Sequence, residues 1–309
     1  MDYPSIRYKY LPLPPHGVET DCDVLGDELA SAVESLMKER KCDCVLFSGG
    51  IDTSFVATAA VEAGLRPRLV TVNLPGGADA EFSKTAAEVL GLELNEARTD
   101  DATIEECKRT AISITRSIDP IEIAADTAAC LGIRAAREAG CRCIATGDGG
   151  DELFLGYPFL FNYDESGVER WYSRVLTGSR FASRELGFAL GVRVELPLYT
   201  DSARQIALKA PLRCKVNEVG GRMYGKVLMR RRLERFGLGT VAWRSKVPVT
   251  DGSGATGLLA RWSSNVDLEK SVELSKRVGI LFPSRAHVHL YSEMEDMCVR
   301  RPERCSDER

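Results

Sequence analysis

The chain has 309 residues, a hydrophobic content of 44% and a formal net charge of -4 at pH 7. This length allows one large or two small domains, and the apolar content is sufficient for a complete core. The acidic total charge argues against a surface built to bind nucleic acid electrostatically. No apolar run approaches the roughly 20 residues of a membrane helix, so no membrane partner is expected. Because Met1-Asp2-Tyr3-Pro4 lacks the layout of a signal peptide, a cytoplasmic location is predicted.

The first half of the chain alternates apolar strand patterns with helical patterns. After an aromatic, proline-rich lead-in (1–24), a helix is predicted from Asp23 to about Lys41. Strands are predicted over 45–47, 69–72, 92–97 and 141–145, and further helices over about 53–63, 80–90, 101–117 and 121–139. Strands that alternate with helices predict an α/β fold with a doubly wound parallel sheet. The strand at 92–97 alternates polar and apolar residues, which indicates an exposed edge of that sheet.

The second half shows weaker strand signals. Helices are predicted over 168–178, 201–209 and 217–236, with proline and glycine between them. We therefore expect a lead-in (1–24), a nucleotide-binding α/β core (25–165), a helical C-terminal lobe (166–285) and a polar tail (286–309).

The most informative stretch joins the first predicted strand to the next helix. Val45-Leu46-Phe47 is an apolar run, and Ser48-Gly49-Gly50 leaves backbone N–H groups open to an anion. Thr53 and Ser54 begin an apolar helix, whose N-terminal dipole favours phosphate. Asp52 places a carboxylate beside this turn, where it is suited to hold Mg²⁺ shared with phosphates. The stretch lacks the Gly-Lys-Ser/Thr ending of a Walker A loop; an ordinary glycine turn is the alternative.

A second glycine-rich stretch, Thr146 to Tyr157, follows the strand at 141–145. Its three acids within a few residues have two interpretations. One is a solvated acidic turn. The other is a carboxylate cluster that faces the first loop, with Asp151 completing the Mg²⁺ site with Asp52 and Asp148 acting as a base toward an amine. In doubly wound sheets ligands bind beyond the carboxyl ends of the strands, where both loops are predicted to lie.

Ten cysteines and three histidines limit the other kinds of chemistry. Most of the cysteines lie in apolar patterns, which favours reduced thiols packed as small hydrophobic side chains. The pairs Cys42/Cys44 and Cys141/Cys143 are not spaced as C-x-x-C, so packing is favoured, although a metal or redox site stays open. None of the histidines lies near a predicted functional loop, which argues against a histidine triad or a histidine-rich zinc site.

The segment SGGIDTS at 48–54 resembles the SGGxDS motif of PP-loop ATP pyrophosphatases (adenine nucleotide α-hydrolase-like fold). Together with GDGGDELFLGY at 147–157, it resembles the synthetase domain of asparagine synthetases and of the related β-lactam synthetase. Four further stretches resemble that family in order: Val72 to Asp79, Arg193 to Leu198, Lys226 to Arg230 and Ala242 to Gly252. The resemblance covers residues 25–260 and implies an AMP-forming amide ligase that uses ATP and Mg²⁺.

The resemblance also implies roles for individual residues. Pyrophosphate would be bound by Ser48, Gly49, Gly50, Thr53 and Ser54, and Mg²⁺ by Asp52 and Asp151. Val72 and Gly147 would offer backbone contacts to the adenosine, and Lys226 would lie near the phosphates. Lys246 would neutralise charge at the α-phosphate, and Asp148 would help the amine attack, at a position where the family has glutamate.

Departures from the family pattern concern the substrates. The arginine-bearing stretch before the second motif is replaced here by Ile121-Glu122-Ile123-Ala124-Ala125, so the identity of the carboxylate substrate is open. The N-terminal Met-Cys of glutamine-dependent relatives and their glutaminase domain are absent from the printed sequence. We therefore expect free ammonia, an amine or a separate glutaminase subunit as the nitrogen source. The oligomeric state, including a homo-oligomer, stays open.

Two other functions are compatible with the motifs. The basic stretch Arg222 to Arg235 would suit a PP-loop enzyme that modifies tRNA or a nucleobase, but a solvated helix face is the favoured interpretation, so nucleic acid is not expected as a partner. A non-catalytic nucleotide-binding protein is the third alternative, against which the retained Asp52, Asp151 and Lys246 argue.

Overall fold

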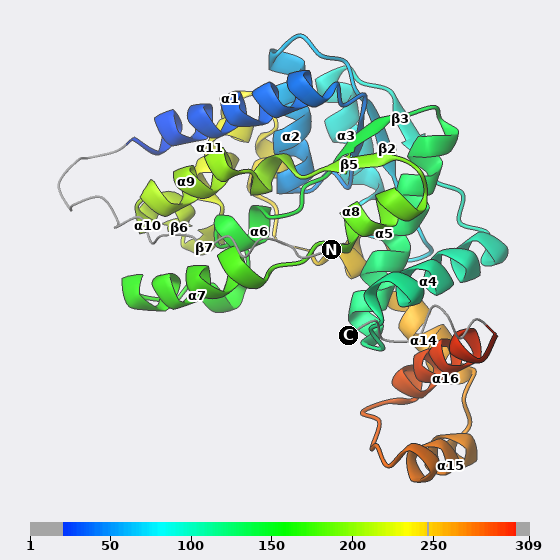
Figure 1. Ribbon diagram of the computed structural model, residues 1–309. Coiled ribbons are helices and arrows are strands. Elements are labelled where there is room, and N and C mark those ends of the chain that lie inside the picture. The colour runs from blue at the N-terminus through cyan, green and yellow to red at the C-terminus, as the bar shows by residue number, and fades with distance from the viewer. Residues whose placement is uncertain (1–20, 246, 301–309) are drawn as a thin grey trace, which may run out of the picture.

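The computed structural model describes residues 21–245 and 247–300 (Figure 1). The predicted lead-in, Lys246 and the last nine residues therefore lie outside the described residues, except for the four lead-in residues 21–24. The element order begins with α1(Cys22–Arg40), β1(Cys44–Leu46), α2(Ile51–Glu62), β2(Arg68–Thr71), α3(Ala80–Leu90), β3(Leu94–Glu96), α4(Asp101–Thr115), α5(Pro120–Glu138), β4(Cys143–Ala145) and α6(Gly150–Leu153). The second half contains α7(Glu165–Gly178), α8(Ala182–Ala189), β5(Arg193–Glu195), α9(Asp201–Lys209), α10(Leu212–Lys215), β6(Val216–Val219), β7(Arg222–Gly225), α11(Val227–Arg235), α12(Gly239–Ala242), α13(Val249–Gly252), α14(Thr256–Ser264), α15(Leu268–Val278) and α16(Arg285–Arg300), with single 3₁₀ turns at Pro158–Leu160 and Pro197–Tyr199.

Five parallel strands form one sheet in the order β3-β2-β1-β4-β5. The chain first adds β2 and β3 on one side of β1 and then adds β4 and β5 on the other side, so the sheet is doubly wound, as predicted. The loops after β1 and β4 leave adjacent strand ends at the switch point, where ligands bind in such sheets. The strand predicted at 92–97 is the edge strand β3.

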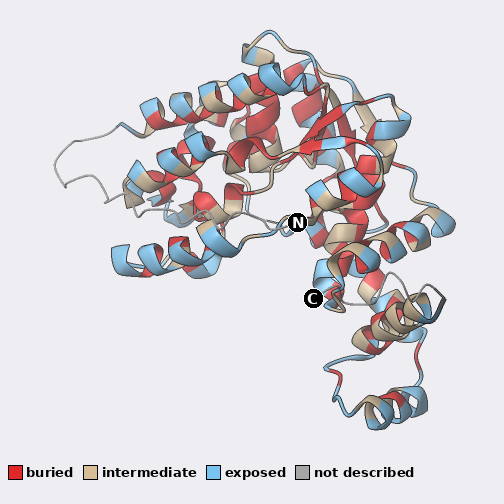
Figure 2. Ribbon diagram, viewed as in Figure 1, coloured by how far each residue is buried: buried red, intermediate tan, exposed pale blue. Residues whose placement is uncertain are grey.

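Helices cover both faces of the sheet, and the side-chain alternation along each strand separates two cores. In the register, Val45 lies opposite Leu69 on one side and Ala145 on the other, and all three belong to one core. Cys44 and Ile144 belong to the second core. Helices α1, α2 and α11 pack on the first face, and α4, α5, α14 and α16 on the second (Figures 1 and 2).

Local sequence explains where the helices begin and end. The Asp21 carboxylate caps α1 by accepting the N–H of Asp23 at 2.9 Å. Asp119 caps α5 in the same way, and Pro120 occupies its first helical position. Gly91 ends α3 in the left-handed conformation that glycine adopts at low cost.

Three predictions for the second half are wrong. Arg193–Glu195 is not part of a purely helical lobe but forms the edge strand β5, paired with β4. Residues 216–225, predicted as part of a helix over 217–236, form the β6–β7 hairpin, and the helix begins only at Val227. Residues 285–300, predicted mostly as a polar tail, form α16, which buries Ala286, Val288 and Leu290.

No helix in the described part of the chain combines the length and the apolar character needed to cross a membrane.

Candidate functional site

The Ser48–Gly50 turn connects β1 to the N-terminus of α2. Gly49 has φ 68°, and a Cβ there would lie 2.6 Å from the Ser83 amide nitrogen, so only glycine fits. Ser48 accepts the Gly50 N–H at 3.2 Å, and Thr53 accepts the Ser48 N–H at 3.3 Å. Because Gly50 caps α2 without a side-chain hydrogen bond, no capping side chain covers the first turn of the helix. Such a helix start is suited to a phosphate group.

Ser54, one turn into α2, is fully buried, and its Oγ has no hydrogen-bond partner among the described residues. An orphaned buried hydroxyl is costly unless something satisfies it. Together with the small-residue turn, this group is compatible with the predicted phosphate site.

The second loop, residues 146–156, lies directly against the first. A Cβ on Gly147 would lie 2.8 Å from the Asp52 Cβ, and one on Gly150 would lie 2.1 Å from Asp52 Oδ1. Gly149 has φ 92°, and a Cβ there would meet the Tyr199 Cβ at 2.7 Å. The prediction that the two loops face each other is confirmed, and the glycines are what permit this approach.

Lys226 lies between the two predicted metal ligands. Its Nζ is 2.5 Å from Asp52 Oδ2 and 2.8 Å from Asp151 Oδ1, and its side chain is only 5% exposed. Burial alone lowers the pKa of Lys226, but the charges of Asp151 and Asp52 outweigh burial and leave it raised. A Cβ on Gly156 would lie 1.9 Å from Asp151 Oδ1 and 2.2 Å from Lys226 Cε. We call Asp52, Asp151 and Lys226 the lysine-bridged pair.

The chemistry of this pair fits a hard cation as well as an ammonium group. Two carboxylates at adjacent loop tips provide the oxygen ligands that Mg²⁺ prefers. Lys226 was predicted to lie near the phosphates, and the structure places its ammonium group at the same loop tips.

A second acidic group lies at the same edge of the sheet and consists of Glu122, Asp126, Asp148 and Glu185. Asp148 Oδ2 accepts hydrogen bonds from the Thr146 hydroxyl at 3.0 Å and from the Ser183 hydroxyl at 2.5 Å. Burial raises the pKa of Asp148 despite these hydrogen bonds. Burial, followed by the charges of Glu122, Asp148 and Glu185, raises the pKa of Asp126 to about 7.

Sequence reasoning missed Asp126 and Ser183. Asp126 directly follows the Ile121–Ala125 stretch in which the family arginine is absent, and this position was the available signal. Glu152 braces the second loop: Tyr157 donates to its carboxylate at 2.5 Å, and Trp171 donates to its carbonyl at 2.8 Å.

The basic stretch at 222–235 is largely neutralised within the chain. Arg231, Arg232 and Arg235 form ion pairs with Asp23 and Asp27 of α1 and with Glu62 of α2. Arg230 is buried, donates to the carbonyls of Gly225, Ala242 and Arg244, and has a pKa lowered to about 10 by burial. The cluster therefore ties α11 to α1 and α2, and three of its arginines already have acidic partners.

Within the described residues, six cysteines pair with one another, and this corrects the prediction of reduced thiols. These three disulfides are Cys22–Cys214, Cys42–Cys143 and Cys44–Cys141, whereas Cys107 and Cys130 are free and buried. Because β1 and β4 are parallel neighbours, the two Cys-x-Cys pairs meet at the strand starts. Alternation along the strands places Cys42–Cys143 in one core and Cys44–Cys141 in the other.

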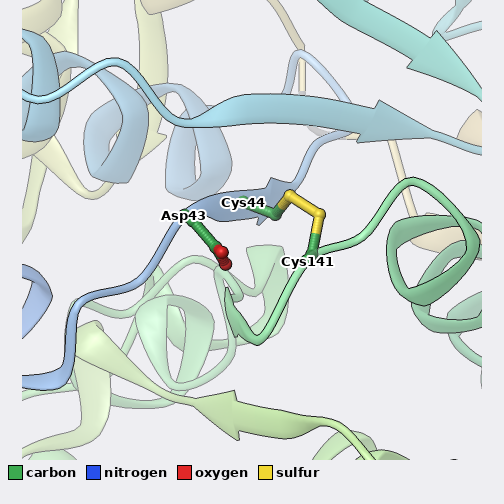
Figure 3. Close-up of side chains that lie close together, drawn as sticks. All are labelled: Asp43, Cys44 and Cys141. Carbon is green, nitrogen blue, oxygen red and sulfur yellow. A yellow bond between two sulfur atoms is a disulfide. The ribbon is translucent and has the colours of Figure 1, made fainter.

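Figure 3 shows the Cys44–Cys141 disulfide beside Asp43. A carboxylate oxygen of Asp43 and the two Sγ atoms all lie within 4.8 Å of one another, a spacing that would suit metal ligands. However, both sulfurs are bonded to each other, and Asp43 Oδ1 accepts the N–H groups of Arg142 and Cys143 at 3.0 Å each. The group is therefore satisfied as a structural cross-link between two strand starts.

Val72 follows β2, is 8% exposed and lies near the same end of the sheet as the two loops. The structure therefore brings Ser48–Ser54, Gly147–Asp151, Val72 and Lys226 to one edge of the sheet. Lys246 lies outside the described residues.

Comparison with known proteins places these features in a family. A family model for asparagine synthase matches residues 24–190. The chain is 25% identical over 255 residues to the Escherichia coli (strain K12) protein "Asparagine synthetase B [glutamine-hydrolyzing]". The matched region covers 76% of this chain and 46% of that protein. It is 24% identical over 190 residues to "Putative asparagine synthetase [glutamine-hydrolyzing] 1" of Methanocaldococcus jannaschii, covering 59% of this chain and 35% of that protein. The chain thus spans less than half the length of these relatives.

Among solved structures, the chain is similar to an NMN synthetase from Francisella tularensis, with 13% identity and a TM-score of 0.44 over 92% of this chain and 97% of that one. It is also similar to an NAD⁺ synthetase from Burkholderia pseudomallei, with 14% identity and a TM-score of 0.31 over 80% of this chain and 91% of that one. The family-model match covers more than half of the chain and includes both glycine loops. The chain belongs to the asparagine synthase family.

Proposed function

We propose that the chain is an ATP-dependent, AMP-forming carbon–nitrogen ligase. The observation that carries the proposal is the contact between the two glycine loops, which brings Asp52, Asp151 and Lys226 together at the sheet edge in a member of the asparagine synthase family. The substrates would be ATP, a small carboxylic acid, and ammonia or an amine.

In the first step, a carboxylate oxygen of the substrate attacks the α-phosphorus of ATP, and the bond to the β-phosphate oxygen breaks. The products are an acyl-adenylate and pyrophosphate. The Ser48–Gly50 turn and the start of α2 would bind the pyrophosphate portion, and Lys226 would supply positive charge next to it. Mg²⁺, when bound by Asp52 and Asp151, would neutralise phosphate charge. Lys246 is proposed, from the family resemblance, to act at the α-phosphate.

In the second step, the nitrogen attacks the acyl carbon, the carbon–oxygen bond to AMP breaks, and the nitrogen loses a proton. Asp148 is the proposed acceptor of that proton. Burial raises its pKa, and a carboxylate with a higher pKa is a stronger base. The surrounding acidic group, Glu122, Asp126 and Glu185, favours a nitrogen donor that arrives as an ammonium ion. Such a donor gives up one proton before its lone pair attacks and a second proton as the amide forms.

The nitrogen source and the location stay proposals. A separate glutaminase subunit or free ammonia would serve equally well in this mechanism. The proposed cytoplasmic location must accommodate the three disulfides of the described residues, since disulfides persist mainly in oxidising compartments or in the cytoplasm of hyperthermophiles. A count of free thiols on protein prepared with rapid alkylation would show whether the cross-links exist in the cell.

The test is ATP–pyrophosphate exchange with Mg²⁺, with aspartate and other carboxylic acids supplied one at a time, followed by addition of ammonia and product analysis. Exchange that depends on one acid would establish adenylation and identify the substrate. If the protein binds ATP but shows no exchange with any acid, the ligase proposal fails for this panel, and a tRNA substrate or a non-catalytic nucleotide-binding role takes its place.

A further inference from the structure

Residues 247–254, which lie beyond the span matched by the family model, are joined to the loop that follows β2. Leu74 donates its N–H to the Ser253 carbonyl at 2.7 Å, and Asp79 donates to the Gly252 carbonyl at 2.9 Å. These backbone bonds join the segment to residues 74–79, which lead into α3.

Glycines make this contact too tight for side chains. A Cβ on Gly77 would lie 2.9 Å from the Gly252 carbonyl oxygen, and one on Gly252 would lie 2.0 Å from Asp79 Oδ2. Gly254 has φ 81°, and a Cβ there would lie 2.5 Å from the Leu74 carbonyl oxygen. The two segments therefore form one closely packed unit.

Arg244 links this unit to the Ser48–Gly50 turn. Its guanidinium group donates to Asp79 Oδ1 at 2.6 Å and to the Gly49 carbonyl at 3.4 Å, and it lies 3.9 Å from the centre of the Phe82 ring. The Arg244 and Asp79 side chains are only 8% and 6% exposed. Gly49 itself packs on the first turn of α3, next to Ser83.

The Gly49 carbonyl is part of the peptide unit that carries the Gly50 N–H. Because a trans peptide is planar, its carbonyl and its N–H point in opposite directions. A cation bound to the Gly49 carbonyl therefore fixes the direction of the Gly50 N–H, which donates to Ser48 Oγ. Without the cation, nothing in this contact would prevent the peptide from turning its carbonyl toward a phosphate.

We propose that Arg244 is a positioning residue for the phosphate-binding turn, acting through the Gly49 carbonyl and Asp79. Residues 247–254 then support the nucleotide site through residues 74–79, from beyond the span that the family model matches. This inference rests on the proposed function, which assigns the Ser48–Gly50 turn to pyrophosphate.

Arg244→Lys is the informative variant, because lysine keeps the charge and the pair with Asp79 but lacks the fork that reaches two acceptors at once. The double variant Arg244→Met with Asp79→Leu removes the buried pair as a whole, which proteins often tolerate. Arg261→Ala is the matched control, since Arg261 forms an exposed ion pair with Asp101 on α4.

Calorimetric titration with pyrophosphate and with a non-hydrolysable ATP analogue, both with Mg²⁺, would measure the effect, and thermal unfolding would confirm the fold. We expect both test variants to bind pyrophosphate about tenfold more weakly than the wild type, in line with the loss of a charged hydrogen bond of about 1.4 kcal/mol. In exchange assays we expect KM for pyrophosphate to rise more than kcat falls. The control should bind as the wild type does.

Folded variants that bind both ligands with wild-type affinity would overturn the positioning role and leave the proposed function intact. A wild-type protein that binds neither ligand would overturn the proposed function and the inference together. A KM and kcat that change in equal proportion with unchanged pyrophosphate affinity would also reject the role assigned to Arg244.

Discussion

Two acidic groups lie at the same edge of the sheet, and they are stabilised in opposite ways. In the lysine-bridged pair, Asp52 and Asp151 share the ammonium group of Lys226. In the second group, Asp148 is held by the hydroxyls of Thr146 and Ser183, and Asp126 has a pKa raised to about 7. Carboxylates held by a cation stay ionised, whereas buried carboxylates without one take up protons more readily. The first group is thus suited to phosphate and metal binding, and the second to proton transfer.

The largest effect is expected from removing the cation of the first group. Lys226→Ala removes the ammonium group that two largely buried carboxylates share, which should cost about 3–5 kcal/mol of unfolding free energy. Urea unfolding at pH 7 would measure the loss, and exchange activity should disappear. Lys209→Ala is the control, because Lys209 pairs with Glu28 at the surface. A Lys226→Ala variant as stable as this control would show that the Lys226 ammonium group does not stabilise Asp52 and Asp151.

The next effect tests the second group as a proton acceptor. Asp148→Asn keeps the size of the side chain but removes the base, so transfer to nitrogen should slow roughly 100-fold while adenylation continues. ATP–pyrophosphate exchange reports the first step, and product formation with ammonia reports both. Equal losses in the two assays would reject the assignment of Asp148 to the second step. Glu152→Gln is a useful control, since Glu152 braces the same loop from the side of Tyr157.

Gly156→Ala addresses the packing of the lysine-bridged pair without removing a charge. The added methyl would overlap Asp151 and Lys226, and overpacking of this kind typically costs about 1–3 kcal/mol. Gly178→Ala is a matched control at the end of α7, where a Cβ meets no atom within 4 Å. It should be neutral or slightly stabilising. Similar melting temperatures for the two alanine variants would show that the lysine-bridged pair can move aside without loss of stability.

The smallest effect concerns the pH dependence of the second group. The folded pKa of Asp126, about 7, lies above its ordinary value of 3.8. The folded state therefore favours the protonated form, and the contribution of Asp126 to stability is lost as pH rises from about 4 to 7. Asp126→Asn does not titrate, so the variant should gain on the order of 1 kcal/mol over the wild type between pH 5 and pH 6.

Urea unfolding at both pH values would measure that difference. A constant difference between variant and wild type across this range would contradict a raised pKa at Asp126.

Local patterns predicted much of the first half of the fold. The strands at β1, β2, β3 and β4 follow apolar or alternating runs, and glycine or an acidic cap marks the ends of several helices. The β6–β7 hairpin was missed, although Gly220-Gly221 is a recognisable signal for it. A two-residue hairpin turn requires positive φ, which both of these glycines have. Strand β5 was missed because three residues at a sheet edge carry almost no periodic signal.

The motifs of the site were predictable, and so was the meeting of Asp52 with Asp151 at the two loop tips. The bridging position of Lys226 between them was not, because it depends on a third segment that is far away in the chain. The contact between Arg244 and the Gly49 carbonyl was missed for the same reason, since these two residues are also far apart in the chain. The Cys42/Cys44 and Cys141/Cys143 spacings could not indicate disulfides, because the pairing depends on β1 and β4 being neighbouring parallel strands of the sheet.

These two cross-links enclose a long segment, since the bonded cysteines are 101 and 97 residues apart. A protease that cuts once in an exposed loop between them would produce two fragments that remain covalently joined. Such a nicked protein would migrate as one species on a non-reducing gel and as two after reduction. The strands that carry both phosphate-site loops would therefore stay side by side after the backbone between them is broken.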